Sequence, residues 1–323
     1  MNGANAPAPL ISIPEAPAPE GVAEWFTGEG GARLRAALFP PPAAARGSVI
    51  LSPGRSEPIE KYFEVVRDLT SRGFVALVHD WHGQGLSARM LKDPLAGHAH
   101  DWKSFLGDYR RMIAAFEARL PRPWIAVGHS MGGGLTALAL AEGEDRFAAA
   151  VLSAPMLGLN LGRVTPRAAG ALAGFMRLIG RGGEYAAPAI DPFDESFDGN
   201  ILTHDARRYE LFKAQLRACP ELRISGPTFG WLLFALKLCA RVRRSRRIDR
   251  LPIPLVIALA GQERLCDNPA AAAVAARAPH GRSFEIPGAF HEILMETDER
   301  RAQFWAAFDA VADRVAPRQA GRS

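Results

Sequence analysis

The sequence predicts an α/β protein in which a mostly parallel sheet, flanked by helices, is interrupted by an inserted helical cap. Continuous apolar runs, typical of strands buried on both faces, alternate with helical patterns towards both ends of the chain. That alternation lapses between residues 156 and 250. With 323 residues, of which 48% are hydrophobic and 23% charged, the chain is long enough to form one large core.

Each expected element follows from its pattern and its boundaries. The strand-like segments are apolar runs that stop at turn residues, and the helix-like segments carry apolar residues at helical spacing. Pro252 and Pro254 mark the point where the alternation resumes. In chain order we expect strands at 48–51, 74–78, 124–127, 148–152, 255–259 and 283–286, and helices at 59–72, 102–120, 268–278 and 298–315.

These patterns predict a core formed by residues 21–155 and 251–317, a helical cap at 156–250, and a flexible tail at 1–20. The tail repeats Ala and Pro and has too little apolar surface to order itself. It also lacks the basic and apolar regions of a secretory signal. No apolar run reaches the ~20 residues of a membrane span. The three cysteines have neither disulfide-framework nor metal-ligand spacing, so we expect a cytoplasmic protein.

The net charge of +5 is concentrated in the predicted cap. Residues 156–250 contain sixteen Lys and Arg against nine Asp and Glu. This excess indicates either a solvated helix end or a surface that contacts anionic membrane lipids. Nucleic acid is not expected, because no recognition motif or interleaved aromatic accompanies the arginines. The arginines of the proposed membrane contact are Arg241, Arg243, Arg244, Arg246 and Arg247.

The stretch AVGHSMGGG, residues 126–134, has the Gly-x-Ser-x-Gly pattern of a nucleophile elbow. An apolar strand leads into it and a small-residue helix leads out, which is the context that the motif requires. A tight turn there exposes the side chain of Ser130, and the following helix N-terminus directs N–H groups at developing negative charge. We therefore expect Ser130 to be a nucleophile and the N–H of Met131 to be an oxyanion donor.

A serine nucleophile needs a base and an acid later in the chain, each following a strand. The strand at 255–259 leads into AGQERLCD, which offers Glu263 and Asp267. The last strand leads into PGAFHEIL, which offers His291. His129 points the wrong way in such a turn, and His280 precedes a strand, so neither is expected to be the base.

Together, GHSMGG, ERLCDN and GAFHEIL resemble the monoglyceride lipase and lysophospholipase branch of the α/β-hydrolases, in particular the bacterial lysophospholipase L2 type. PTFGW, residues 227–231, is similar to the cap motif of that branch. The resemblance implies the α/β-hydrolase fold and places the acid at Glu263. Asp267 remains the alternative acid, although its place just before Asn-Pro favours a helix cap.

The resemblance also implies a second oxyanion donor in the loop SPGRSEP, residues 52–58. The family pattern begins with His-Gly, which is Pro-Gly here, and by position the donor is the N–H of Arg55. In HDWHGQGLS, residues 79–87, His82 replaces an Arg of the family pattern. Asp80 and Gly85 of the same stretch are expected to be structural.

These features predict a serine hydrolase that cleaves the acyl ester of single-chain glycerolipids, most of all lysophospholipids, through a Ser-His-Glu triad and an acyl-enzyme. Phe175, Trp231 and Phe234 lie in apolar stretches of the cap that could accept the acyl chain. No metal or organic cofactor is expected. HEIL is not the metalloprotease motif HExxH, because residue 295 is Met.

Three other functions remain open at this point. The chain could be a monoacylglycerol lipase or a general carboxylesterase that takes a small ester. It could be a proline-type aminopeptidase on the same fold. A non-catalytic binding protein is the third, although a degenerate site would be expected to lose members of the triad.

Overall fold

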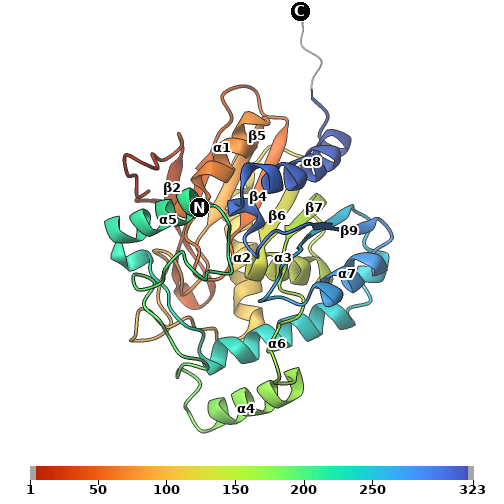
Figure 1. Ribbon diagram of the computed structural model, residues 1–323. Coiled ribbons are helices and arrows are strands. Elements are labelled where there is room, and N and C mark those ends of the chain that lie inside the picture. The colour runs from red at the N-terminus through yellow and green to blue at the C-terminus, as the bar shows by residue number, and fades with distance from the viewer. Residues whose placement is uncertain (1–4, 319–323) are drawn as a thin grey trace, which may run out of the picture.

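A computed structural model describes residues 5–318, and its framework is one nine-stranded sheet with helices on both faces (Figure 1). The strands are β1 (Ala6–Ala8), β2 (Val22–Thr27), β3 (Arg33–Phe39), β4 (Gly47–Ser52), β5 (Phe74–His79), β6 (Trp124–His129), β7 (Phe147–Ser153), β8 (Leu255–Ala260) and β9 (Gly281–Ile286). The helices are α1 (Phe63–Ser71), α2 (Trp102–Phe116), α3 (Ser130–Ala141), α4 (Pro166–Leu178), α5 (Ala206–Ala218), α6 (Phe229–Arg244), α7 (Asn268–Arg277) and α8 (Asp298–Val315). A 3-10 turn, η2 (Ile59–Tyr62), precedes α1.

The strand order is β1-β2-β3-β5-β4-β6-β7-β8-β9. All pairings from β5 to β9 are parallel, whereas β1, β2 and β3 join antiparallel at one side. Every residue of β4 and β6 is buried, because helices cover both faces of the sheet centre. The prediction of a mostly parallel sheet flanked by helices is confirmed, and each of the six predicted strands is present.

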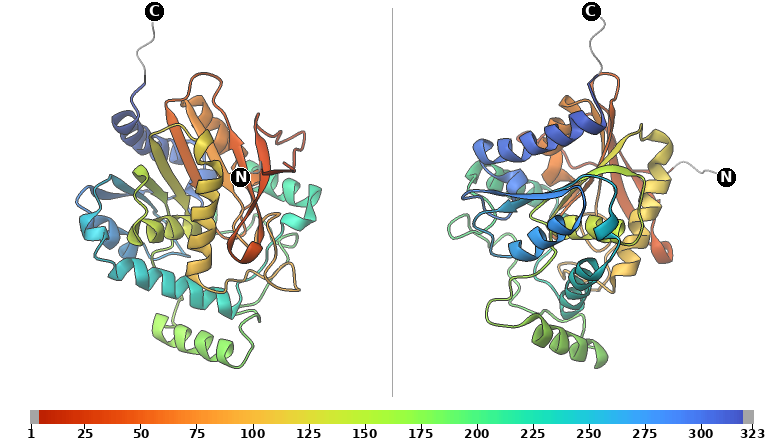
Figure 2. Two further views of the ribbon diagram at one scale, coloured as in Figure 1. Left: turned by 180° about the vertical axis from the view of Figure 1, so that it is seen from behind. Right: turned by 90° about the vertical axis from the view of Figure 1, so that its right-hand side faces the viewer.

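The two faces of the sheet form two separate apolar clusters. Helices α1 and α8 pack on one face, and α2, α3, α6 and α7 contribute to the cluster on the other. Figure 2 shows α2 and α8 on opposite sides of the sheet. Both clusters meet at β4 and β6, so these central strands are held from both sides. The carboxyl ends of such strands are the natural place for a site in an open parallel sheet.

The chain between β7 and β8 carries α4, α5 and α6, in agreement with a helical insertion at this point. Helix α4 lies outermost and packs against α6 (Figure 1). Helix α6 is different, because Leu238 and Val242 are fully buried in the core cluster that also contains α3. A Cβ added to Gly134 of α3 would lie 3.1 Å from the Leu238 side chain. Helix α6 therefore belongs to the packed body of the protein as much as to the insertion.

The N-terminal segment differs from the flexible tail expected for residues 1–20. Residues 1–4 of that tail lie outside the described part of the chain. From residue 5 onward the segment is ordered, since β1 pairs with β2 and Ile13 and Ala16 are buried. The Arg35 guanidinium donates to the carbonyl of Pro9, and the Ile11 N–H donates to Glu60. Buried charged side chains of the core therefore form hydrogen bonds with the backbone of the segment and order it. The amino-acid composition of the segment does not reveal these long-range contacts.

None of the helices within residues 5–318 combines the length and the apolar content that crossing a bilayer requires.

Candidate active site

The Gly-x-Ser-x-Gly stretch forms a sharp turn from β6 into α3. Ser130 begins α3 with a φ of +49°, a left-handed conformation that is strained for a residue with a side chain. A Cβ on Gly132 would collide with the carbonyl oxygens of Ser52 and Pro53, and one on Gly128 would lie 2.8 Å from the Cα of Gly133. Both glycines are therefore required by close backbone packing, as the motif predicts.

The structure brings Ser130, His291 and Glu263 into one hydrogen-bonded row. The Nε2 atom of His291 lies 2.8 Å from the Oγ atom of Ser130, and its Nδ1 atom lies 2.7 Å from the Oε2 atom of Glu263. Glu263 follows β8, His291 follows β9, and Ser130 follows β6, so all three sit beyond the carboxyl ends of parallel strands. The imidazole is buried while Ser130 remains partly exposed, which leaves the hydroxyl accessible to a ligand.

Glu263 is held as an ionised acceptor. Its second oxygen accepts hydrogen bonds from the N–H groups of Leu265 (2.7 Å) and Cys266 (3.1 Å). Burial acts to raise the pKa of Glu263, but the bonds from His291 and from these N–H groups outweigh it and hold the pKa below its ordinary value. Asp267 instead caps α7 by accepting from the N–H of Ala270 at 3.0 Å. The structure therefore brings Glu263 to His291 and leaves Asp267 in the capping position that its sequence context favours.

In the loop after β4, the N–H groups of Arg55 and Glu57 have no internal acceptor among the described residues. The N–H of Gly54 donates to the Oε2 atom of Glu57 at 2.5 Å, and the N–H of Ser56 donates to Gln84. Between them, the N–H of Arg55 has no acceptor within the described part of the chain. The N–H of Met131 lies in the first turn of α3, where no preceding helical carbonyl is available. Because Gly132 packs against the Ser52 and Pro53 carbonyls, the two segments that carry these N–H groups are in direct contact.

A buried ionic cluster, formed by Glu57, Lys61, Tyr62 and Glu292, joins this loop to the one that carries His291. The Lys61 ammonium donates to Glu57 at 2.8 Å and to Glu292 at 2.5 Å, and the Tyr62 hydroxyl donates to Glu57 at 2.5 Å. Burial acts to raise the pKa of Glu57, yet Lys61, a neighbouring histidine and these hydrogen bonds lower it to about 2. Sequence reasoning missed this cluster, for which the only local signal was the four-residue spacing of Glu57 and Lys61.

Asp80 and Gly85, expected to be structural, and His129, not expected to be the base, all have structural contacts. Asp80 accepts from Arg35 at 2.7 Å and from the N–H groups of Ile59 and Leu86, and a Cβ on Gly85 would collide with it. His129 is buried with its Nδ1 atom 3.1 Å from the carbonyl of Ser153. Burial lowers the pKa of His129 to about 4, so the ring is neutral at pH 7.

The three cap residues proposed to contact substrate occupy different environments. The indole N–H of Trp231 points at the Met131 sulfur, 3.4 Å away. Phe234 is buried and packs on Phe105, with ring centroids 4.9 Å apart. Phe175 lies on α4 and is 56% exposed. Only Trp231 is thus in contact with the elbow, while Phe234 supports α6 from within the core.

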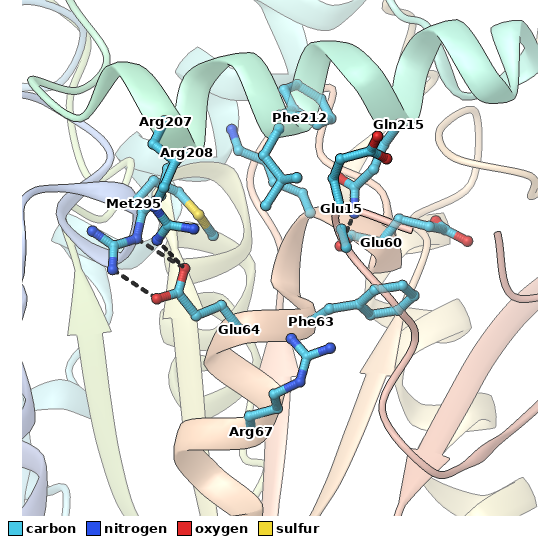
Figure 3. Close-up of a pocket in the computed structure, with 13 residues that line it drawn as sticks. Glu15, Glu60, Phe63, Glu64, Arg67, Arg207, Arg208, Phe212, Gln215 and Met295 are labelled. Carbon is cyan, nitrogen blue, oxygen red and sulfur yellow. Dashed lines mark hydrogen bonds and ion pairs between the residues drawn. The ribbon is translucent and has the colours of Figure 1, made fainter. Parts of the chain in front are cut away.

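A separate cavity of about 260 Å³ lies between α5, α1 and the N-terminal segment, away from Ser130 (Figure 3). Its lining is strongly charged. Within the lining, Glu64 accepts from Arg208 at 2.6 Å, and it also accepts from Arg301, outside the lining, at 3.0 Å. Gln215 of α5 donates to the carbonyl of Glu60 at 2.8 Å. These contacts are typical of a polar seam between two elements rather than a site for an apolar chain.

Comparison with known proteins gives a consistent set of relatives. The family model described as "Serine aminopeptidase, S33" (Hydrolase_4) matches residues 43–298. Lysophospholipase L2 of Escherichia coli is 32% identical over 290 residues, covering 82% of this chain and 79% of the relative. A monoacylglycerol lipase of Mycolicibacterium smegmatis is 27% identical, covering 85% and 91%, respectively.

Solved structures show the same fold at lower identity. A soluble variant of monoglyceride lipase from Saccharomyces cerevisiae, in complex with a substrate analogue, has a TM-score of 0.71 at 18% identity and covers 91% of this chain and 96% of that one. A thermostable carboxyl esterase from Bacillus coagulans has a TM-score of 0.72 at 14% identity, with 91% and 98% covered. The α/β-hydrolase fold expected from the sequence is confirmed.

The contact between Gly132 and the loop after β4 predicts that alanine substitutions at two glycines will change the free energy of unfolding in opposite directions. Gly132→Ala should lower the free energy of unfolding by about 1–3 kcal/mol, because the colliding atoms are backbone carbonyls that cannot rotate away. Gly174→Ala on α4 is the matched control, since nothing lies within 4 Å of its added Cβ; it should stabilise by roughly 0.4–1 kcal/mol. Urea unfolding of both variants measures the difference, and equal effects would contradict the packing argument.

The ionic cluster predicts a contribution of Glu57 to acid unfolding. Because folding lowers the pKa of Glu57 from 4.5 to about 2, the stability it contributes is fully present above pH 4.5 and is lost as the pH falls toward 2. Glu57→Gln should be less stable than the wild type at pH 7 and should lose less stability between pH 4.5 and 2. Urea midpoints measured across this range test the prediction; parallel curves for the two proteins would argue against it.

Proposed function

The chain belongs to the α/β-hydrolase family described as "Serine aminopeptidase, S33", and from this premise we propose that it hydrolyses the acyl ester of single-chain glycerolipids, most of all lysophospholipids. The protein is a serine ester hydrolase. We assign the nucleophile to Ser130, the base to His291 and the acid to Glu263. The observation that carries this assignment is the unbroken row of hydrogen bonds from the Ser130 hydroxyl to the Glu263 carboxylate.

In the proposed reaction the Ser130 oxygen attacks the ester carbonyl carbon while its proton moves to the Nε2 atom of His291. Glu263 accepts from the Nδ1–H of His291, which keeps the imidazole in the required tautomer and stabilises its charged form. The tetrahedral intermediate then expels the glycerol oxygen, which takes the proton from His291. Water, activated by the same imidazole, releases the fatty acid from Ser130.

The negative charge of the intermediate would be held by the N–H groups of Arg55 and Met131. Each lacks a competing internal acceptor in residues 5–318, and their segments pack together. Main-chain donors of this kind are already oriented before the charge develops, which is why they lower the barrier. Replacing the family's His-Gly with Pro-Gly removes no donor, because the proposed donor is a main-chain group.

Lysophospholipids are proposed ahead of monoglycerides because the 32% identical relative is a lysophospholipase, whereas the monoacylglycerol lipase of M. smegmatis is 27% identical. Monoacylglycerol hydrolysis is the alternative that this second relative favours. A general carboxylesterase is a further alternative, which the B. coagulans structure favours. The peptidase activity named in the family description is the last alternative.

We also propose that the C-terminal end of α6 contacts an anionic membrane surface. The five arginines from Arg241 to Arg247 are all exposed. Arg241 is paired with Glu142 at 2.5 Å, but the other four have no carboxylate within 4 Å among the residues that the structure describes. Unpaired exposed guanidinium groups can bind lipid phosphates without first breaking an internal ion pair. Peripheral association of this kind would bring the enzyme to substrates that reside in a bilayer.

The triad assignment is tested by three substitutions. Ser130→Ala should abolish both labelling by a fluorophosphonate probe and hydrolysis of a palmitoyl lysophospholipid. Glu263→Gln should lower kcat on the order of 10⁴-fold, by analogy with the Asp→Asn change in a serine protease triad, because the imidazole loses its correct tautomer. Asp267→Asn should retain most activity and lose roughly 1 kcal/mol of stability, the cost of a weakened cap. If Asp267→Asn lost more activity than Glu263→Gln, the acid of the triad would be Asp267. Fluorophosphonate labelling of Ser130→Ala would contradict the assignment of Ser130 as the nucleophile.

The membrane contact is tested by charge removal at Arg243, Arg244, Arg246 and Arg247. The variant with all four changed to Gln should bind anionic vesicles more weakly in a sedimentation assay, since each arginine contributes about 1 kcal/mol near such a surface. The variant with four lysines is the matched control and should retain most binding. Added salt should weaken binding of the wild type. Equal sedimentation of the Gln variant and the wild type would refute the contact.

A further inference from the structure

The side chain of Arg55 is a cation placed beside the elbow that the reaction scheme above does not use. Its Nη1 atom donates to the carbonyl of Ser225 at 2.6 Å. Its guanidinium carbon lies 5.6 Å from the ring centroid of Trp231, whose indole N–H in turn points at Met131. The Trp231 ring therefore lies between the guanidinium and Met131, the residue that follows Ser130.

The position of this guanidinium is set by a short two-segment ribbon. The N–H of Ser225 donates to the carbonyl of Leu95. The N–H of Gly97 donates to the carbonyl of Gly226, and the N–H of Thr228 donates to the carbonyl of Gly97. A Cβ on Gly97 would lie 3.1 Å from the Nη1 atom of Arg55, so glycine leaves the space that the guanidinium fills. The ribbon and Trp231 thus form a cradle around Arg55.

The charge of Arg55 is not neutralised within the described residues, where no carboxylate lies within 4 Å of it. Burial lowers its pKa, and the fields of Glu195 and Glu57 oppose that shift only from a distance. A desolvated cation without a paired anion is costly to the fold. Such a cost is expected where an anionic ligand completes the site.

Arg89 provides a comparison within the same protein. It is also partly buried and without an ion pair in residues 5–318, but all three of its nitrogens donate to backbone carbonyls, those of Pro94, Ser87 and Glu221. Arg55 has one such bond. The remaining donors of Arg55 form a planar fork of the kind that matches two oxygens of a phosphate group. Each side-chain nitrogen of Arg89 thus already donates a hydrogen bond within the protein, whereas Arg55 has donors left for a ligand.

We propose that the Arg55 guanidinium binds the phosphodiester of a lysophospholipid while the ester carbonyl is attacked by Ser130. This inference rests on the proposed function and specifies the group that selects the head group. One residue would then serve both ends of the substrate's glycerol, with its backbone N–H at the ester and its side chain at the phosphate. A monoacylglycerol has a hydroxyl in place of the phosphate and would leave the cation unpaired, which disfavours that substrate.

The test compares two substrates with the same acyl chain, palmitoyl lysophosphatidylethanolamine and 1-monopalmitoylglycerol. Arg55→Met retains the backbone N–H and the side-chain length but removes the charge and the donors. It should lower the ratio of kcat/KM for the lysophospholipid to kcat/KM for the monoglyceride by roughly tenfold to a hundredfold, the range for a hydrogen bond to a charged group. Arg55→Lys, which keeps the charge without the fork, should give an intermediate ratio.

Arg89→Met is the matched control, because it removes a comparable half-buried guanidinium outside the cradle and should leave the ratio at its wild-type value. Fluorophosphonate labelling and the thermal midpoint show whether each variant is folded with an intact elbow. A second readout independent of turnover uses the Ser130→Ala background, in which binding of an ether-linked lysophospholipid, followed by tryptophan fluorescence, should weaken when Arg55→Met is added.

The outcomes separate this inference from the proposed function. One outcome is that the wild type cleaves the lysophospholipid while Arg55→Met lowers kcat/KM for both substrates by the same factor. In that case Arg55 only stabilises the cap, and the inference is wrong while the proposed function stands. If the wild type cleaves only the monoglyceride, the head group assigned under the proposed function is wrong, and the inference falls with it. If Arg89→Met changes the ratio as much as Arg55→Met, the effect is one of general stability and the role of Arg55 is refuted.

Discussion

The site depends on one backbone contact, the packing of the first turn of α3 against the loop after β4. Gly132 meets the carbonyls of Ser52 and Pro53 so closely that no side chain fits between them. The contact joins the helix that begins with the strained Ser130 to the loop that carries the N–H of Arg55. Nucleophile and proposed oxyanion donors are thus positioned by the same steric constraint, and none of them needs a mobile side chain to be brought into place.

The site is also stabilised by buried charged side chains that are paired with one another and hydrogen-bonded. Lys61 lies between Glu57 and Glu292, and Glu57 also receives the N–H of Gly54. Since Glu292 follows His291 directly in the chain, the loop with the proposed oxyanion donor and the loop with the imidazole are tied to the same ammonium group. Removing one member would leave a charge without its partner inside the protein, a much larger penalty than losing a surface ion pair.

The parts of the molecule that could be predicted from the sequence are those with a local signature. Continuous apolar runs identified β4 to β9, and the order of Ser130, an acid after β8 and His291 after β9 identified the row of hydrogen-bonded side chains. Asp267, the alternative acid, caps α7, which is the position that its place before Asn-Pro favours. The ordered N-terminal segment was missed because its backbone is held by Arg35 and Glu60, which are distant in sequence. The ionic cluster was missed for the same reason, and exposed Phe175 shows that an apolar stretch alone does not tell which side chain faces the site.

The position of the insertion bears on how such proteins diversify. β7 and β8 are hydrogen-bonded neighbours although about a hundred residues separate them, so the insertion leaves and re-enters the sheet at adjacent strands. Loops of this kind can be lengthened or exchanged in evolution without shifting the strands that they connect. The exchangeable unit is smaller than the insertion, however, because α6 shares its core with α3 and its N-terminal turn carries Trp231. Recombination between relatives would therefore keep α6 with the sheet, and α5 as well, because Arg208 and Gln215 of α5 bind Glu64 and Glu60 of the core. The segment that can vary at little cost to folding, and where new substrate preferences can arise, is the one around the outermost helix α4.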